Sequence, residues 1–301
     1  MTRFSKKLLS LLIALLLLLS AVSCKGKDAP APATTAATTD SAASTDEAAA
    51  TTSTPDETAV TATETAIPPT QPATVADPDE LLRSEQSDPN DRYDAAGFIS
   101  VTDAIPDAKL EIRYSTAHNF VGDPINGYDE PIALLTKEAT ASLIGASNDL
   151  RKQGYLIKIY DAYRPQRAVD HFVSWANDFD DTRMKDEFYP DLDKSSLFSS
   201  GYIAYSSGHS RGSTIDLTLV DAATGKDVDM GGSFDYFGTL SHPDYTGITE
   251  KQYQNRMILR NAMVNNGFSP LSTEWWHFSL NSEPYPYTYF DFPVSSSSLQ
   301  K

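Results

Sequence analysis

Aromatic residues are concentrated in one part of this chain, and their distribution limits where it can build a hydrophobic core. Every tryptophan and almost every tyrosine and phenylalanine lie after residue 92, although the whole chain has 301 residues and is 40% hydrophobic. Aromatic side chains dominate the energetics of cores, so we expect one folded domain over residues 93–295. About 200 residues are ample for one core, although the length alone would allow two domains. The single cysteine excludes an intramolecular disulfide.

Residues 1–24 are predicted to be an export signal. A basic start precedes an apolar run from Leu8 to Leu19, and small residues follow as in a cleavage region. The run is too short for a transmembrane helix. Cys24 comes next, and the stretch resembles a bacterial lipobox, in which cleavage leaves the cysteine as a lipid-modified N-terminus. We therefore expect an extracytoplasmic lipoprotein that is bound to the cell membrane only through its lipid; a plain secretory signal is the alternative.

Residues 25–92 consist mainly of Ala, Thr, Pro, Ser and acidic residues. Such a composition buries too little apolar surface to offset the entropy of ordering, so we expect a disordered linker. Residues 25–96 carry 4 basic and 14 acidic side chains, so about −10 of the net charge of −17 belongs to this segment. Nothing in the chain forms the basic patch that nucleic acid requires, which excludes that partner. The Ser-rich end, residues 296–301, is also predicted to be disordered.

One stretch of the expected domain places an imidazole seven residues before a carboxylate, as His209 and Asp216, with the turn-forming Gly212 between them. Residues 213–219 alternate small or polar side chains with apolar ones, which is typical of a half-buried strand. Asp216 is therefore predicted to lie in a strand, and His209 on the loop that leads into it.

A second stretch, Glu274-Trp275-Trp276-His277, supplies another imidazole and a glutamate. Two histidines and one aspartate are a suitable ligand set for zinc, with one position left open for water. A nearby glutamate that is not a ligand is the usual general base for that water. A single histidine is more often structural, but the four residues together, each with its flanks, favour a catalytic zinc site. Strict strand alternation would put Glu274 and His277 on opposite faces, so we expect a bend, or a strand that begins after Glu274.

These motifs resemble those of the D-alanyl-D-alanine dipeptidases, the VanX-type zinc peptidases. The family's Ser-x-His-x-x-Gly-x-Ala-x-Asp is similar to residues 207–216, with Thr214 in place of alanine, and its Glu-x-Trp-His is similar to residues 274–277. Further blocks that match are Tyr163–Pro165, Asp229–Gly231, Phe234–Phe237, Glu283–Pro286 and Tyr289–Pro293. The resemblance runs from about Phe98 to Val294. The zinc motif alone is shared with related cell-wall carboxypeptidases.

The resemblance implies a cofactor and a set of catalytic residues. One Zn²⁺ per chain would be held by His209, Asp216 and His277. Glu274 would take the proton of the attacking water and later deliver one to the leaving amine. Arg164, at a junction between a strand and a helix, would stabilise the oxyanion of the tetrahedral intermediate, a role that suits a permanently charged guanidinium.

The implied substrate is the dipeptide D-alanyl-D-alanine, hydrolysed to D-alanine in cell-wall peptide turnover or glycopeptide resistance. Ser207 resembles the family residue that binds the substrate carboxylate, and Asp235 the one that binds its ammonium. The best-known relatives act in the cytoplasm, whereas this chain carries an export signal. Two alternatives therefore stay open: a D,D-carboxypeptidase acting on peptidoglycan stem peptides, and a catalytically silent zinc-containing lipoprotein that binds the cell wall. The sequence gives no prediction of the oligomeric state.

The predicted fold is α+β, with a mostly antiparallel sheet, helices packed on one side of it, and the zinc site at its open face. We expect strands over residues 110–114, 155–160, 213–219 and 274–280. We expect helices over residues 136–153, after Pro165, and over residues 248–266.

Overall fold

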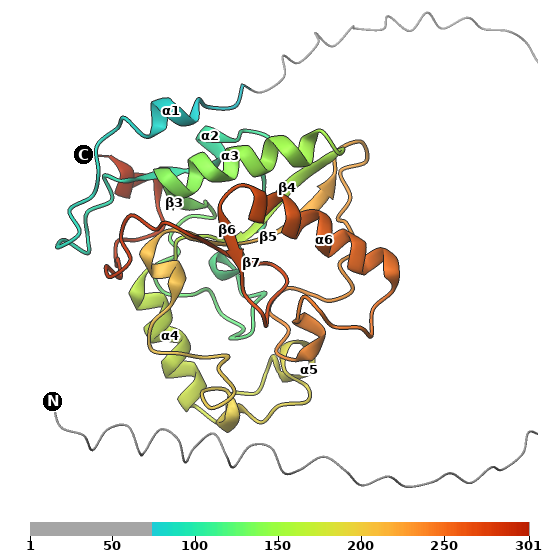
Figure 1. Cartoon of the computed structure of the whole chain (residues 1–301). Coiled ribbons are helices and arrows are strands. Elements are labelled where there is room, and N and C mark those ends of the chain that lie inside the picture. The colour runs from blue at the N-terminus through green and yellow to red at the C-terminus, as the bar shows by residue number, and fades with distance from the viewer. Residues whose placement is uncertain (1–73, 301) are drawn as a thin grey trace, which may run out of the picture. The chain divides into compact units, whose positions relative to one another are not determined.

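The computed structural model describes residues 74–300 of the chain (Figure 1). Its α-helices are α1 (Pro78–Leu81), α2 (Val101–Ala104), α3 (Lys137–Arg151), α4 (Gln166–Asn177), α5 (Lys185–Phe188) and α6 (Glu250–Asn265). Its strands are β1 (Phe98–Ser100), β2 (Lys109–Leu110), β3 (Leu134–Thr136), β4 (Tyr155–Asp161), β5 (Thr214–Asp221), β6 (Phe268–Pro270) and β7 (His277–Leu280). Between residues 74 and 300, no helix is long and apolar enough to cross a membrane. The predicted export signal, Cys24 and most of the predicted linker lie outside the described residues.

The main sheet has five strands in the order β2-β4-β5-β7-β6, and β1 and β3 form a separate antiparallel pair. The prediction of a mostly antiparallel sheet needs a correction, because the sheet is mixed: β2 runs parallel to β4, although the three other pairings are antiparallel. Parallel neighbours need a crossover connection, and here the chain passes through β3 and α3 before it enters β4. The strand expected over residues 110–114 is short, because the 3₁₀ helix η1 (Arg113–Ser115) begins soon after β2.

The two faces of the sheet differ in character. Ile157 and Ile159 of β4 pair with Leu219 and Leu217 of β5, and all four side chains are fully buried. Burying a side chain of this size stabilises the fold by about 1.5–3 kcal/mol. Because side chains alternate along a strand, Asp216 points to the opposite face.

Helices lie on both sides of this sheet rather than on one. In Figure 1, α3 and α6 lie together along one side, in contact with β4 and β6 respectively, and α4 lies on the other. The helices expected over residues 136–153 and 248–266 are confirmed as α3 and α6. Thr136 caps the first turn of α3, and Thr249 and Gln252 form a capping box at the start of α6.

Residues that precede and follow the predicted domain, 93–295, contact that domain in the structure. The buried ammonium of Lys137 donates hydrogen bonds to the backbone oxygens of Ser84 and Glu85. Tyr285 donates to Gln86 at 2.6 Å and accepts from the backbone of Ser87 at 2.8 Å. This part of the predicted linker therefore lies along the domain. At the C-terminal end, the Ser295 hydroxyl donates a hydrogen bond of 2.7 Å to Glu130. The 3₁₀ helix η5 (Ser296–Leu299) begins at the next residue.

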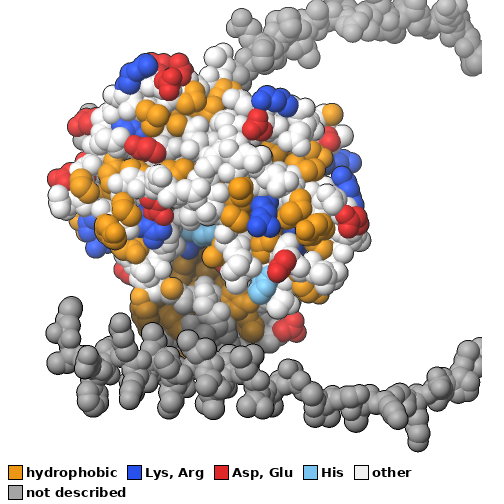
Figure 2. Space-filling model, in the orientation of Figure 1, with side chains coloured by type: hydrophobic (Ala, Val, Ile, Leu, Met, Phe, Trp, Pro, Cys, Tyr) orange, Lys and Arg blue, Asp and Glu red, His pale blue; other side chains and the backbone are white. Residues whose placement is uncertain are grey.

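Charged side chains of both signs are interspersed on the face of the domain shown in Figure 2. Hydrophobic side chains occur among them in small groups, which is ordinary for a protein surface. Over all the described residues, the most exposed large hydrophobic side chains are aromatic: Tyr93, Phe179, Tyr205 and Tyr287. This face therefore has no continuous field of one charge.

Candidate metal and catalytic site

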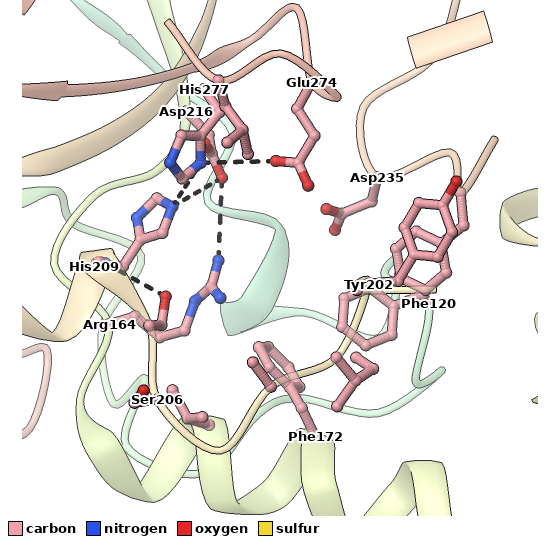
Figure 3. A pocket seen from close by; sticks show the side chains of 18 of the residues that line it. Phe120, Arg164, Phe172, Tyr202, Ser206, His209, Asp216, Asp235, Glu274 and His277 are labelled. Carbon is pink, nitrogen blue, oxygen red and sulfur yellow. Dashed lines mark hydrogen bonds and ion pairs between the residues drawn. The ribbon is translucent and has the colours of Figure 1, made fainter. Parts of the chain in front are cut away.

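A cavity of about 270 Å³ lies on the Asp216 face of the sheet (Figure 3). Strand β5, the start of β7, helix α4 and the segment around residues 201–209 supply its walls. All seven residues that the sequence singles out for catalysis, metal binding or substrate binding line it: Arg164, Ser207, His209, Asp216, Asp235, Glu274 and His277. The chain thus brings together side chains that are more than 100 residues apart in sequence.

The three predicted metal ligands come from three adjoining elements. His209 lies in the 3₁₀ helix η3 (Gly208–Arg211), Asp216 in β5, and His277 at the start of β7 directly opposite Asp216. Gly212 ends η3 with φ at 78°, and a Cβ there would collide with the Phe98 ring. Only glycine suits both conditions, so Gly212 fixes how His209 is presented to the strand.

The possible donor atoms of these three residues are close together, all within 4.8 Å of one another. His209 Nε2 lies 3.3 Å from Asp216 Oδ2 and 3.3 Å from His277 Nδ1, and His277 Nδ1 lies 3.0 Å from Asp216 Oδ1. Ligand atoms on a tetrahedral ion with bonds of about 2.0–2.1 Å are about 3.3 Å apart. The spacing of the three side chains therefore matches a tetrahedral metal site.

Hydrogen bonding and charge also fit a cation here. The backbone oxygen of Ala162 lies 2.7 Å from His209 Nδ1; with the proton on that nitrogen, Nε2 is free to act as a ligand. Asp216 Oδ1 is buried and accepts no well-formed hydrogen bond, which is costly unless a cation satisfies it. Burial opposes ionisation of Asp216, but the imidazoles of His209 and His277 hold its pKa well below the usual range. An ionised carboxylate and two imidazoles are the donor set that zinc prefers.

Glu274 lies in the turn that precedes β7, so the conflict with strand alternation does not arise. Its Oε2 is 3.5 Å from His277 Nδ1, and its side chain is 28% exposed. Burial raises the pKa of Glu274. Trp275 and Trp276 occupy the turn between the two residues and are buried in the core, as expected for packing residues.

Arg164 is held beside the metal ligands by a carboxylate that the sequence analysis did not single out. Its guanidinium lies 2.8 Å from Asp161 Oδ2 and 3.9 Å from Asp216 Oδ2, with the Tyr114 and Phe172 rings beneath it. Asp161 is fully buried and accepts a hydrogen bond of 2.5 Å from Tyr128. The guanidinium is thus oriented by one carboxylate and stacked on aromatic rings, which keeps it ordered.

A register shift explains why Asp161 lies on the Asp216 face of the sheet. Ile159 pairs with Leu217, but Asp161 pairs with Asp216, so β4 contains one extra residue at this point. Such a bulge turns the following side chain to the other face of a sheet. Simple alternation would have placed Asp161 beside Ile159 on the opposite face.

The two predicted substrate-binding residues differ in their surroundings. Among residues 74–300, Asp235 is the only non-glycine residue with a positive φ, 60°, a conformation that Asp tolerates better than most residues. Tyr114 donates a hydrogen bond of 2.9 Å to Asp235 Oδ2. Burial and the nearby Asp216 carboxylate raise the pKa of Asp235 well above its usual range. The Ser207 hydroxyl accepts from the backbone of His209 at 3.3 Å and borders the cavity.

Aromatic residues form a further part of the wall. Tyr114, Phe120, Phe172 and Tyr202 line the cavity. Phe120 lies in the Gly/Pro/Asn-rich loop that separates η1 from β3, and Phe172 lies on the apolar face of α4. Phe172 reads as a core residue in the sequence, because periodicity does not distinguish a core face from a cavity wall. The loop that holds Phe120 resembles the family loop that helps to wall the active site.

Comparison with known proteins gives consistent matches over the domain. The model of the Peptidase M15 family, described as D-ala-D-ala dipeptidase, matches residues 94–295. A D-alanyl-D-alanine dipeptidase of Enterococcus faecium is 42% identical over 198 residues, which cover 66% of this chain and 98% of the relative. One of Streptomyces coelicolor is 39% identical over 198 residues, with the same coverage of 66% and 98%. One of Escherichia coli is 32% identical over 187 residues, or 62% and 86%.

Proposed function

This chain belongs to the D-alanyl-D-alanine dipeptidase family of zinc metallopeptidases, and we propose that its cavity hydrolyses the free dipeptide D-alanyl-D-alanine to D-alanine. One observation carries the proposal. The possible metal ligands His209, Asp216 and His277 share one cavity with the carboxylates of Glu274 and Asp235 and with the Arg164 guanidinium. The comparisons give no support to a carboxypeptidase or to a silent binding protein.

The three ligand side chains would hold one zinc ion per chain. Zinc bound there supplies a Lewis acid that polarises a carbonyl and makes water more acidic. The protein orients the ligands: the Ala162 carbonyl lies beside the His209 ring, and strand pairing sets Asp216 against His277.

Glu274 and Arg164 would carry out the remaining chemistry, which is proton transfer and stabilisation of the oxyanion. Glu274 stands 3.5 Å from a ligand atom without belonging to the ligand set, so it would take the proton of the attacking water. Its pKa is raised by burial, which makes the carboxylate a stronger base; the proton that it takes would then pass to the leaving amine. Arg164 also lines the cavity, 3.9 Å from Asp216 Oδ2, and would stabilise the negative charge that develops on the carbonyl oxygen.

Asp235 and Ser207 would bind the two charged ends of the dipeptide. A buried carboxylate such as Asp235, with a single tyrosine hydroxyl as hydrogen-bond donor, suits a substrate ammonium. Ser207 borders the cavity near His209 and would donate its hydroxyl to the substrate carboxylate. A site that binds both ends discriminates against longer peptides, because these bury an unpaired charge or clash.

The test is hydrolysis of free D-Ala-D-Ala and of a pentapeptide that ends in D-Ala-D-Ala, by the same zinc-loaded protein. We expect D-alanine to be released from the dipeptide with a much higher kcat/KM than from the pentapeptide. A preference for the pentapeptide would assign the protein to carboxypeptidase chemistry instead.

We propose further that the protein is exported and held at the outer face of the bacterial cell membrane by lipid on Cys24. The support is the sequence alone: a basic start, an apolar run too short to span a bilayer, and the lone cysteine directly after it. Acyl chains attached to Cys24 would bind by inserting into the bilayer. The linker would then separate the catalytic domain from the membrane.

Cys24→Ala is expected to move the protein from the membrane fraction to the soluble or unprocessed pool, because the thiol that carries the lipid is lost. Ser23→Ala, one position earlier, keeps the cysteine and a small residue at the cleavage region, and should remain in the membrane fraction. Fractionation followed by immunoblotting measures both variants. A Cys24→Ala protein that stays membrane-bound at its processed length would show that lipid on this residue is not the anchor.

A further inference from the structure

A second cavity, of about 400 Å³, adjoins the catalytic cavity. The two cavities share two lining residues, Tyr202 and Phe237. Their rings are stacked, with centroids 4.9 Å apart and an angle of 15° between the planes. This pair of rings therefore forms the partition between the two cavities.

The partition lies at one end of the catalytic cavity. In Figure 3, Tyr202 lies on the side of Asp235, away from His209 and Ser206. The second cavity is lined by the residues that follow Asp235 in the chain, from Tyr236 to Leu240. Burial raises the pKa of the Tyr202 hydroxyl, and the Glu274 carboxylate adds to the rise, so this ring lies near the proposed base.

The direction of the substrate follows from the proposed function, on which this inference rests. If the ammonium of the dipeptide lies at Asp235, a third residue attached to that nitrogen would extend toward Tyr202 and the second cavity. We propose that Tyr202, stacked on Phe237, limits the substrate to two residues by closing the catalytic cavity at the point where a third residue would begin.

The chemistry of the second cavity indicates which extension it could receive. Its wall includes the rings of Tyr236 and Tyr245 in addition to the two rings of the partition, and the carboxylate of Asp191. Tyr236 donates a hydrogen bond of 3.3 Å to Asp191 Oδ2. Aromatic faces and a carboxylate together attract a cationic side chain. The best-matched extension is therefore a lysine before D-Ala-D-Ala that is acylated at Nα and keeps its charged ε-ammonium.

An extended peptide meets a second barrier at Asp235. Its nitrogen at this point is an amide rather than an ammonium, so the buried carboxylate loses its cationic partner. Removing the Tyr202 ring should therefore relieve the steric barrier and leave the electrostatic one. We expect the variant to gain activity on the extended peptide without matching the rate of the wild type on the dipeptide.

Tyr202 can be truncated with little risk to the fold. It is only part-buried and lies in the irregular segment between η2 (Lys194–Ser196) and η3. The backbone N–H of Tyr202 donates a hydrogen bond of 3.0 Å to the Leu197 oxygen, and truncation of the side chain leaves this bond in place. Tyr205 offers a matched control, because it lies in the same segment, is 72% exposed and lines neither cavity.

The experiment measures kcat/KM of four proteins on D-Ala-D-Ala and on Nα-acetyl-L-Lys-D-Ala-D-Ala, from the D-alanine released. The proteins are the wild type, Tyr202→Ala, Tyr202→Phe and Tyr205→Ala. The ratio of kcat/KM for the extended peptide to that for the dipeptide should rise at least about 10-fold in Tyr202→Ala, since pocket contacts of this size discriminate by that much. Tyr202→Phe keeps the ring and should have the wild-type ratio, as should Tyr205→Ala.

Three results would overturn the inference. The first is an unchanged ratio in Tyr202→Ala together with retained dipeptide hydrolysis. The second is a wild type that already cleaves the extended peptide as well as the dipeptide. The third is loss of both activities in both Tyr202 variants, which would make the hydroxyl part of catalysis. Failure of the proposed function is distinguishable from all three, because the wild type would then not hydrolyse D-Ala-D-Ala.

Discussion

Glu274→Gln is expected to keep its bound zinc and its fold while kcat on D-Ala-D-Ala falls at least about 100-fold. The amide keeps the shape of the side chain but cannot accept the proton of water, and loss of a general base typically costs 10²–10⁴-fold. The loss should be toward the larger end of this range, because the same carboxyl would also protonate the leaving amine. Glu274 is 3.5 Å from His277 but outside the cluster of possible ligand atoms, so metal binding should survive.

The measurement is zinc content and kcat on the same preparation of each variant. Glu274→Ala should behave like Glu274→Gln, since neither side chain can take the proton. Glu250→Gln is a suitable control, because it makes the same chemical change at an exposed position in the first turn of α6. A Gln variant with near-normal kcat would remove Glu274 from the mechanism, and one that loses zinc with its activity would make it a ligand.

His277→Ala is expected to lose both zinc and activity. His277 Nδ1 lies 3.0 Å from Asp216 Oδ1 and 3.3 Å from His209 Nε2, so the substitution removes one of three ligand atoms that define the site. Two remaining protein ligands are fewer than the three that catalytic zinc sites ordinarily use. The loss of hydrolysis should follow the loss of metal.

His242→Ala is the matched control for this variant. His242 lies in the loop after η4 (Thr239–Ser241) and does not line the catalytic cavity, and the sequence analysis does not include it among the ligands. We expect it to keep both zinc and kcat, as measured by metal analysis after gel filtration and by D-alanine release. Tightly held zinc at the wild-type level in His277→Ala would show that the ligand set is wrong.

The main elements around the site could be predicted from sequence because their signals are local. The alternation through residues 213–219 predicted β5, and the helical spacing of apolar residues predicted α3 and α6. The ligand cluster could be predicted because His209, Asp216 and His277 lie in motifs with characteristic flanks. Glu274 posed a conflict that local reasoning left with two solutions, and the structure has the second, in which the strand begins after the turn.

Other features depend on contacts between distant segments and have no local signal. The parallel pairing of β2 with β4 is set by the crossover through α3, and only two residues of β2 take part. Asp161 lies on the Asp216 face of the sheet, beside Arg164, because of a register shift between β4 and β5, which neither strand encodes alone. The stacked pair Tyr202 and Phe237 joins two loops that are 35 residues apart in sequence.

The most direct test of the account is a zinc titration of the full chain, followed by the rate of D-alanine release from D-Ala-D-Ala. The metal is first removed with a chelator, and zinc is then returned in fractions of one equivalent. We predict that activity falls to background after chelation and returns in proportion to zinc until one equivalent per chain is bound. Full activity in the metal-free protein, or a rate that continues to rise to two equivalents, would contradict a single zinc site formed by His209, Asp216 and His277.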